Sequence, residues 1–221
     1  MISRAIAGLY AITPEITDTA ALLRMTRQVL EGGAQLIQYR NKAADIALRI
    51  EQATLLADLC REAAAPFIIN DHPDLAAELD ADGVHLGKQD ISIAEARRRL
   101  GRGKIIGVSC YNKLEQALEA EREGADYIAF GAFFVSGTKP GAVTASLELL
   151  QRAKRKLHIP IVAIGGINFA NAAQLIRHGA DALAVVNGVF ATQNVRYAAA
   201  DISRLFQVKH HTPHEFSNDV A

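Results

Sequence analysis

The sequence predicts a single (β/α)8 barrel, and three observations lead to that prediction. Eight short apolar segments alternate with eight segments of helical spacing along the chain. The apolar segments are rich in Val and Ile, as are parallel strands that are covered on both faces. Four joints between a helical segment and the next apolar segment share a Gly in a short turn: 33–35, 81–83, 124–126 and 179–181. Eight repeated βα units of this kind are typical of a closed barrel.

The expected strands end in small or polar residues, which cannot continue a buried strand. They cover residues 8–14, 36–42, 66–71, 83–87, 104–109, 127–130, 160–166 and 182–187. The first is stopped by Pro14, and the second runs into charged residues. An open doubly wound sheet is the alternative, but no Gly-x-Gly-x-x-Gly motif follows the first strand.

The expected helices are recognised by apolar spacing and by residues that start and stop helices. They cover residues 18–31, 45–64, 73–79, 92–100, 114–122, 147–156, 171–177 and 198–206. In the first of them, Thr17 or Asp18 can cap the amino end, and Gly32 follows the last turn. We expect one catalytic domain over residues 1–206 and a polar, flexible tail over residues 207–221.

The composition excludes several classes of protein. Half of the 221 residues are apolar, which is enough for a large core, and 24 basic residues balance 24 acidic ones. We therefore expect no nucleic-acid partner, since the basic run 97–99 lies at a helix end that favours cations. No apolar run is long enough for a membrane span, and the amino end does not resemble a signal peptide. The two cysteines have no metal-binding spacing, so we expect a reducing, cytoplasmic location.

The segment after the sixth strand has the composition of an anion-binding loop. It contains Ser136, Gly137, Thr138 and Lys139, and then a Pro-Gly pair. Hydroxyls, backbone N–H groups and one ammonium suit a phosphate. The alternative is a surface turn that happens to contain a lysine.

Similar groups follow the other strands, and in a barrel these ends meet at one rim. The residues at the strand ends are Gln38, Arg40, Lys42, Asn70, Asp71, Asp90, Ser109, Thr138, Lys139, Gly165, Gly166 and Asn187. Two carboxylates together with diphosphate oxygens form a suitable shell for Mg²⁺. The list thus suggests a Mg²⁺-diphosphate enzyme. A barrel that uses the carboxylates as acid and base remains open, as does a helix-capping role for each of them.

Two further residues have competing interpretations. His85 alternates with apolar residues in the fourth strand, which favours packing inside the barrel over metal ligation, since no second His has ligand spacing. Ser109 precedes Cys110 and suggests a nucleophile. No pattern of a histidine base accompanies it in the sequence, so this interpretation is not favoured.

Seven motifs, taken in order, resemble the thiamine phosphate synthase family over about residues 8–190. They are Gly8-Leu-Tyr-Ala-Ile-Thr, Gln38-Tyr-Arg-Asn-Lys42, Asn70-Asp71, Asp82-Gly-Val-His-Leu-Gly87 with Asp90, Ile106-Gly-Val-Ser109, Ser136-Gly-Thr-Lys139 and Ile164-Gly-Gly-Ile167. The resemblance implies a TIM barrel and a transferase of thiamine biosynthesis. Such an enzyme joins hydroxymethylpyrimidine diphosphate to a thiazole phosphate, or to its carboxy form, and releases pyrophosphate.

The resemblance also implies roles for particular residues. Asp71 and Asp90 would bind Mg²⁺, and Arg40, Ser109 and Lys139 would act on the reacting diphosphate. The wider set implied to contact the pyrimidine diphosphate is Gln38, Tyr39, Arg40, Asn41, Lys42, Asn70, Ser109 and Lys139. The set implied to contact the thiazole phosphate is Ser136, Gly137, Thr138, Gly166, Val186 and Asn187. The implied partners are these small molecules, with homo-oligomers as a further option.

The sequence departs from the family pattern at two points. Asn187 stands where the family usually has Ser, and Gly87-Lys88-Gln89 replaces the commoner Gly-Gln-Glu. Two alternatives stay open: a thiazole tautomerase of the same superfamily, and a barrel that only binds a phosphorylated ligand. The tautomerase lacks much of the diphosphate and Mg²⁺ set. The joint presence of Arg40, Lys42, Asp71, Asp90 and Lys139 favours the synthase.

Overall fold

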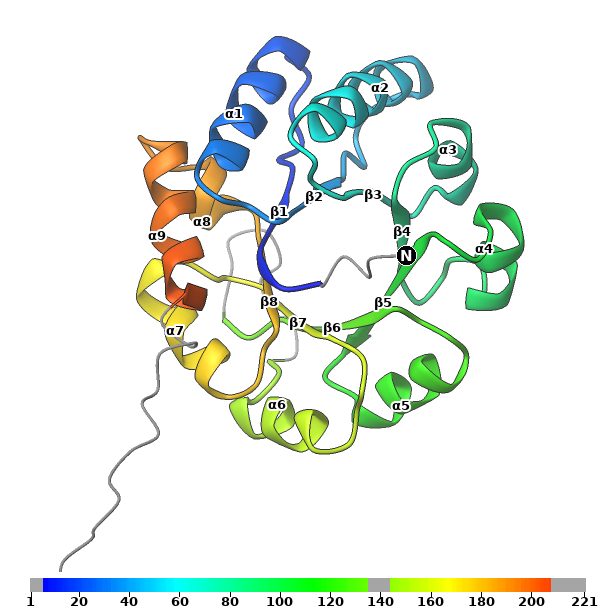
Figure 1. Ribbon diagram of the computed structural model, residues 1–221, viewed down its shortest axis with the longest axis vertical. Helices are drawn as coiled ribbons and strands as arrows, with labels where there is room; N and C mark the ends of the chain where they lie inside the picture. The colour runs from blue at the N-terminus through cyan, green and yellow to red at the C-terminus, as the bar shows by residue number, and fades with distance from the viewer. Residues whose placement is uncertain (1–5, 135–143, 208–221) are drawn as a thin grey trace, which may run out of the picture.

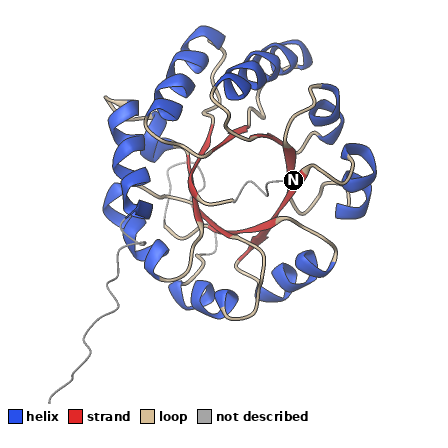
Figure 2. Ribbon diagram, in the orientation of Figure 1, coloured by secondary structure: helices blue, strands red, loops and turns tan. Residues whose placement is uncertain are grey.

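A computed structural model describes residues 6–134 and 144–207, and it confirms the predicted barrel. Eight parallel strands pair in chain order, and β8 pairs with β1 to close the ring. Figure 1 shows the helices surrounding this ring, and Figure 2 separates the inner strands from the outer helices by colour. In the described part of the chain, no helix is both long enough and apolar enough to cross a membrane.

The strands are short, and all but one contain four or five residues. They are β1 (Gly8–Ile12), β2 (Leu36–Tyr39), β3 (Phe67–Asn70), β4 (Gly83–Leu86), β5 (Ile105–Tyr111), β6 (Tyr127–Gly131), β7 (Ile161–Ile164) and β8 (Ala182–Val185). The helices are α1 (Thr19–Glu31), α2 (Ile46–Glu62), α3 (Pro73–Glu78), α4 (Ile93–Leu100), α5 (Leu114–Arg122), α6 (Leu147–Lys154), α7 (Phe169–Arg177), α8 (Asn187–Phe190) and α9 (Val195–Gln207).

The end of the eighth unit differs from the prediction. The extended backbone stops at Val185, and Asn187 is the first residue of the short helix α8 rather than the last residue of a strand. A helix of four residues is too short to show a helical period in the sequence. The last helix also begins earlier than expected, at Val195 instead of residue 198.

Three of the four joints predicted from glycines have the expected geometry, whereas at the fourth Gly83 is already the first residue of β4. Gly124 follows α5 with φ 91°, and Gly179 follows α7 with φ 112°. These backbone angles strain any residue that carries a Cβ, so glycine allows the chain to turn directly from the helix into the next strand. At the other end of the helices, Asp18 accepts a hydrogen bond from the N–H of Ala21 at 2.9 Å, as its predicted capping role requires.

The alternation of side chains along the strands divides the core into two parts. One part fills the barrel and includes Tyr10, Leu36, Ile68, Tyr127 and Val162. The other lies between the strands and the helices, and its members from β1, β2, β4, β6 and β8 include Leu9, Ile37, Val84, Ile128 and Leu183. Residues of one parity therefore point into the barrel, and their neighbours in the chain pack against helices.

Candidate active site

The candidate residues at the carboxyl end of β2 alternate between the two faces of the strand. Some therefore point into the barrel, and others point towards the helices. Gln38 points into the barrel, where its Nε2 donates to the Tyr10 hydroxyl at 2.7 Å. Tyr39 and Asn41 point outward, and both donate to Oε1 of the buried Gln52 on α2, at 3.0 and 3.1 Å. The expectation that Tyr39 and Asn41 contact a substrate is not supported by this geometry. Their side chains lie against α2 because the strand alternates.

Arg40 and Lys42 follow β2, and each is paired with a carboxylate. Arg40 forms an ion pair with Glu15 of the loop after β1. Lys42 Nζ lies 2.8 Å from Oδ2 of Asp71, in the loop after β3. The Lys42 side chain is 59 % exposed, so its ammonium remains accessible to a ligand at this rim.

Asp71 and Asp90 occupy the rim and do not cap helices. The N-cap residue of α3 is His72, which makes no side-chain capping bond, and α4 is capped by Ser92. Oδ2 of Asp90 instead accepts a hydrogen bond from the N–H of Gly87 at 2.6 Å. Asp71 has φ 61°, in the left-handed region that Asp adopts more readily than most residues with a side chain. The capping interpretation of the two carboxylates is therefore wrong.

The two carboxyl groups interact with each other and have opposite electrostatic environments. Burial acts to raise the pKa of Asp71, but hydrogen bonds from Lys42 and with Asp90, and then the Lys42 charge, hold that pKa below its usual value. Burial also raises the pKa of Asp90, and the neighbouring Asp71 adds to this effect against the hydrogen bond from Gly87. Two carboxylates this close need positive charge when both are ionised.

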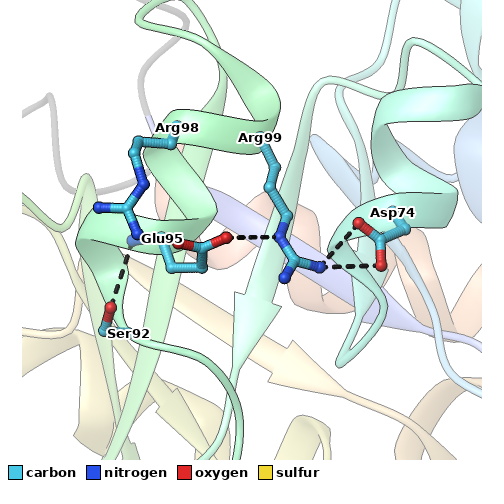
Figure 3. A network of polar contacts seen from close by, with 5 residues as sticks. All are labelled: Asp74, Ser92, Glu95, Arg98 and Arg99. Carbon is cyan, nitrogen blue, oxygen red and sulfur yellow. Dashed lines mark hydrogen bonds and ion pairs between the residues drawn. The ribbon is translucent and has the colours of Figure 1, made fainter.

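Helices α3 and α4, which follow the two carboxylates, are joined by a polar network (Figure 3). Arg99 of α4 donates to both carboxylate oxygens of Asp74 on α3 at 2.8 Å. Arg99 also donates to Glu95 at 2.9 Å, and the N–H of Glu95 donates to the Ser92 hydroxyl at 3.2 Å. The network links the two helices at the surface of the barrel. The predicted basic run at 97–99 is thus engaged in ion pairs on the surface.

His85 and Ser109 meet at the rim, although no sequence pattern connects them. Nε2 of His85 lies 2.8 Å from Oγ of Ser109, and Nδ1 lies 2.9 Å from the Tyr127 hydroxyl. Burial lowers the pKa of His85 to about 4, which makes it a weak base. Burial also raises the pKa of Cys110 to about 12. These environments do not favour a nucleophilic Ser109 or Cys110.

The far side of the rim brings together the loops after β7 and β8. Gly166 has φ 64°, and its carbonyl accepts from Nδ2 of Asn171 at 3.0 Å. A Cβ on Gly188 would lie 2.1 Å from the carbonyl oxygen of Ile167, so α8 packs directly against the loop after β7. Gly166 and Asn187 therefore lie on adjacent loops. Ser136, Gly137, Thr138 and Lys139 lie outside the described residues.

Two surface hollows adjoin the carboxylates. One of about 360 Å³ is lined by residues of α2, α3 and the Asp71 loop, including Arg49 and His72. The other, of about 260 Å³, lies between α4 and α5 and is lined by Asp90 and Ser109 among others. Neither is lined by Gln38, Arg40 or Asn70, so neither alone defines the candidate site. The site is instead defined by the residues at the strand ends.

Comparison with known proteins identifies the family. The model of the family described as thiamine monophosphate synthase matches residues 9–189. The chain belongs to this family. It is 56 % identical to a thiamine-phosphate synthase of Nitrosospira multiformis, over 92 % of this chain and 87 % of the relative. It is 53 % identical to a thiamine-phosphate synthase of Nitrosomonas eutropha, over 91 % of this chain and 95 % of the relative.

A solved structure supports the same assignment to the thiamine monophosphate synthase family. The thiamine phosphate pyrophosphorylase of Pyrococcus furiosus superposes with a TM-score of 0.85 at 37 % identity. The alignment covers 94 % of this chain and 99 % of that chain. The family resemblance and the enzyme class expected from the motifs are thereby confirmed.

Three residues that were not predicted from the sequence contact candidate residues: Tyr10, Tyr127 and Glu15. The signal for the two tyrosines was the parity of their strands, which places both inside the barrel. No sequence signal distinguished Glu15 from a solvated acid. In the described residues, no group of three or more His, Cys, Asp and Glu side chains forms a potential metal cluster.

Proposed function

We propose that this protein condenses 4-amino-2-methyl-5-hydroxymethylpyrimidine diphosphate with a 4-methyl-5-(2-hydroxyethyl)thiazole phosphate or its carboxy form. The products are thiamine phosphate and pyrophosphate, and CO2 is released in addition when the carboxy form is the substrate. Membership in the family supports this reaction. The observation in the structure that supports it most is the convergence of Lys42, Asp71 and Asp90 at the carboxyl ends of three consecutive strands.

The donor set suits Mg²⁺. Two hard carboxylates interact at the rim, and burial together with Asp71 disfavours the charged form of Asp90 unless a cation is added. Mg²⁺ takes few protein ligands and completes its shell with water and phosphate oxygens, so two carboxylates are sufficient. Asp71 and Asp90 would hold the ion. When bound, Mg²⁺ neutralises charge that develops on the leaving diphosphate.

The remaining rim residues divide between the two substrates. We assign the pyrimidine diphosphate to Gln38, Arg40, Lys42, Asn70 and Ser109. Lys139 joins this set on the basis of the family resemblance alone. Gly166, Val186 and Asn187 would hold the thiazole phosphate, and their adjacent loops are consistent with one phosphate between them. Ser136, Gly137 and Thr138 join them by resemblance.

The chemistry requires neutralisation and positioning. The C–O bond between the pyrimidine methylene and the diphosphate breaks, and the electron-rich amino-pyrimidine delocalises the positive charge. The thiazole nitrogen then forms the new C–N bond, and pyrophosphate leaves with both electrons of the broken bond. Arg40, Lys42 and Ser109 stabilise the leaving oxygens, and the barrel holds the two rings in line. No strong base is needed, which agrees with the low pKa of His85.

The test is turnover with both purified substrates, with thiamine phosphate and pyrophosphate measured together. A thiazole tautomerase would act on the carboxythiazole phosphate alone, and a binding protein would form no product. Conversion of the thiazole without the pyrimidine diphosphate, or no product with excess Mg²⁺, would contradict the proposal. A cytoplasmic location and homo-oligomers remain parts of this proposal and need separate measurements. Of the predicted tail over residues 207–221, Gln207 is the last residue of α9, and the others lie outside the described residues.

A further inference from the structure

A chain of hydrogen bonds runs through the barrel interior and ends at Ser109. Gln38 Nε2 lies 2.7 Å from the Tyr10 hydroxyl, which lies 2.8 Å from the Tyr127 hydroxyl. The chain continues from Tyr127 to Nδ1 of His85 and from Nε2 of His85 to Ser109. The five side chains come from β2, β1, β6, β4 and β5, so the chain crosses the barrel from one wall to the other.

The chain is shielded from solvent except at its last member. Gln38, Tyr10 and Tyr127 are at most 2 % exposed, and His85 is 8 % exposed. Ser109 is only partly buried and lines the 260 Å³ hollow beside Asp90. Because water has little access to the buried members, each hydroxyl must find its hydrogen-bond partners within the chain. The donor at each link therefore depends on the donor at the previous link.

Each tyrosine has a single hydroxyl hydrogen, which fixes the direction of the whole chain. If Gln38 donates through Nε2, the Tyr10 hydroxyl accepts and then donates to Tyr127. Tyr127 in turn donates to Nδ1 of His85, which must be unprotonated. The proton of the neutral imidazole then resides on Nε2, and that N–H donates to Ser109.

The neutral form of His85 agrees with this direction. A protonated imidazole would present an N–H to Tyr127 as well as to Ser109. Tyr127 would then donate to Tyr10, which already receives the Gln38 N–H, and the Tyr10 hydrogen would have no acceptor in the chain.

The packing around Tyr127 fixes the position of its hydroxyl. The His85 and Tyr127 rings stack with centroids 5.6 Å apart, and Tyr10 meets Tyr127 edge to face at 5.9 Å. A Cβ on Gly107 of β5 would lie 2.0 Å from Cζ of Tyr127. The ring thus occupies space that only a glycine leaves open.

We propose that Gln38, Tyr10, Tyr127 and His85 are positioning residues. The first three hold His85 as the Nε2–H tautomer, and His85 in turn makes Ser109 a hydrogen-bond donor to an anionic substrate oxygen. Ser109 accepts the His85 N–H, and its own hydrogen is then free to point into the barrel mouth. The opposite direction would use the Ser109 hydrogen on His85 and present lone pairs to an anion. The identity of that anion as a diphosphate rests on the proposed function, whereas the tautomer does not.

The first experiment measures the tautomer directly in the full-length wild-type protein. Two-dimensional NMR of protein labelled with ¹⁵N-histidine, at pH near 7.5, distinguishes the protonated from the unprotonated ring nitrogen. His85 is assigned among the seven histidines by the signal that disappears in His85→Gln. We expect a protonated Nε2 and an unprotonated Nδ1. A protonated Nδ1 would overturn the proposal, whatever the enzyme catalyses.

The second experiment tests whether the chain acts through Ser109. Tyr127→Phe removes one hydroxyl, and we expect kcat for thiamine phosphate formation to fall about 3- to 10-fold. In a Ser109→Ala background the same change should alter kcat less than 2-fold, because the group being oriented is absent. Independent, multiplicative losses in the two backgrounds would overturn the proposal. If Tyr127→Phe does not fold, Tyr10→Phe takes its place in the same cycle.

The matched control is Tyr39→Phe, which also removes the hydroxyl of a buried tyrosine. The Tyr39 hydroxyl lies on the outer face of β2 and donates to Gln52. We expect this variant to lower thermal stability as well, but less than Tyr127→Phe does, because the Tyr127 hydroxyl is bonded to both Tyr10 and His85. The His85 spectrum should keep its Nε2–H pattern in Tyr39→Phe and shift towards mixed tautomers in Tyr127→Phe. Equal spectral changes in the two variants would contradict the proposal.

Discussion

Lys42 Nζ lies 2.8 Å from Oδ2 of Asp71 and links the carboxyl ends of β2 and β3. The lysine neutralises one of two interacting carboxylates, while Asp90 lacks a comparable ion pair in the described residues. When both are ionised, Asp71 and Asp90 thus carry more negative charge than Lys42 alone balances. This arrangement is the basis of the predicted dependence on a divalent cation.

We expect Asp71→Asn and Asp90→Asn to lose most of the turnover while they remain folded. The amide keeps the shape of the side chain but removes the charge that would bind Mg²⁺. The measurement is product formation across a Mg²⁺ titration, together with thermal unfolding. Asp74→Asn is the matched control, since Asp74 is an exposed partner of Arg99 on α3. Full wild-type activity in excess chelator would contradict a role for the metal.

The stability of the protein should fall as the pH drops from about 6.5 to about 4. The folded-state pKa of His85 is lowered from 6.5 to about 4 by burial, so within this range the unfolded state binds more protons. The contribution of His85 is present above pH 6.5 and is lost as the pH falls, by roughly 3 kcal/mol. Chemical unfolding of wild type and His85→Gln between pH 4 and 7.5 checks this. The same pH dependence in both proteins would contradict it.

Asn187→Ser should keep synthase activity and mainly change KM for the thiazole phosphate. An amide and a hydroxyl both donate to a phosphate, but the amide is longer. Asn187 is the first residue of α8, which packs against the loop after β7. Initial rates with each substrate varied in turn separate the two KM values. A change confined to the pyrimidine diphosphate would assign Asn187 to the other substrate.

Charge should matter more than shape at Lys139, which lies outside the described residues. We expect Lys139→Met to slow the single-turnover rate much more than Lys139→Arg does. The loss of one charge-assisted contact to a developing anion costs about 2–4 kcal/mol, or roughly 30- to 1000-fold in rate. A Lys139→Met enzyme as fast as wild type would remove Lys139 from the diphosphate site.

Gln52→Leu should destabilise the protein by roughly 2–3 kcal/mol. Gln52 is fully buried on α2 and accepts from both Tyr39 and Asn41, while its own Nε2 donates to the carbonyl of Ile16 at 3.0 Å. Leucine leaves these buried groups with fewer partners, and each unsatisfied group costs about 1–3 kcal/mol. Denaturant unfolding measures the change, with the exposed Gln151→Leu as control. Equal stability of both variants would contradict the assignment of Tyr39 and Asn41 to the outer face.

Most of the fold could be predicted from the sequence because it depends on local patterns. Apolar runs, caps such as Asp18 and glycines such as Gly124 and Gly179 are each visible within a few residues. Helix α8 was missed because a single turn has no period to detect. The outward orientation of Tyr39 could have been read from the alternation along β2, because neighbouring residues of a strand point to opposite faces.

The candidate site could be predicted only as a set of strand ends. Whether Asp71 and Asp90 cap helices or face the rim depended on which residue begins each helix, and His72 and Ser92 proved to take those positions. The buried hydrogen-bond chain could not be predicted, because Tyr10 and Tyr127 are 117 residues apart in the sequence. Only the closure of the barrel brings them together.

The alternation along β2 limits how this protein can change over evolutionary time. Deleting one residue within the strand would send Tyr39 into the barrel and turn Gln38 towards α2, so one event would damage both the interior and the outer shell. A substitution alters one face at a time. Insertions and deletions should therefore be tolerated in the connecting loops and eliminated within the strands, and changes of substrate preference should arise through replaced side chains in a barrel wall of constant length.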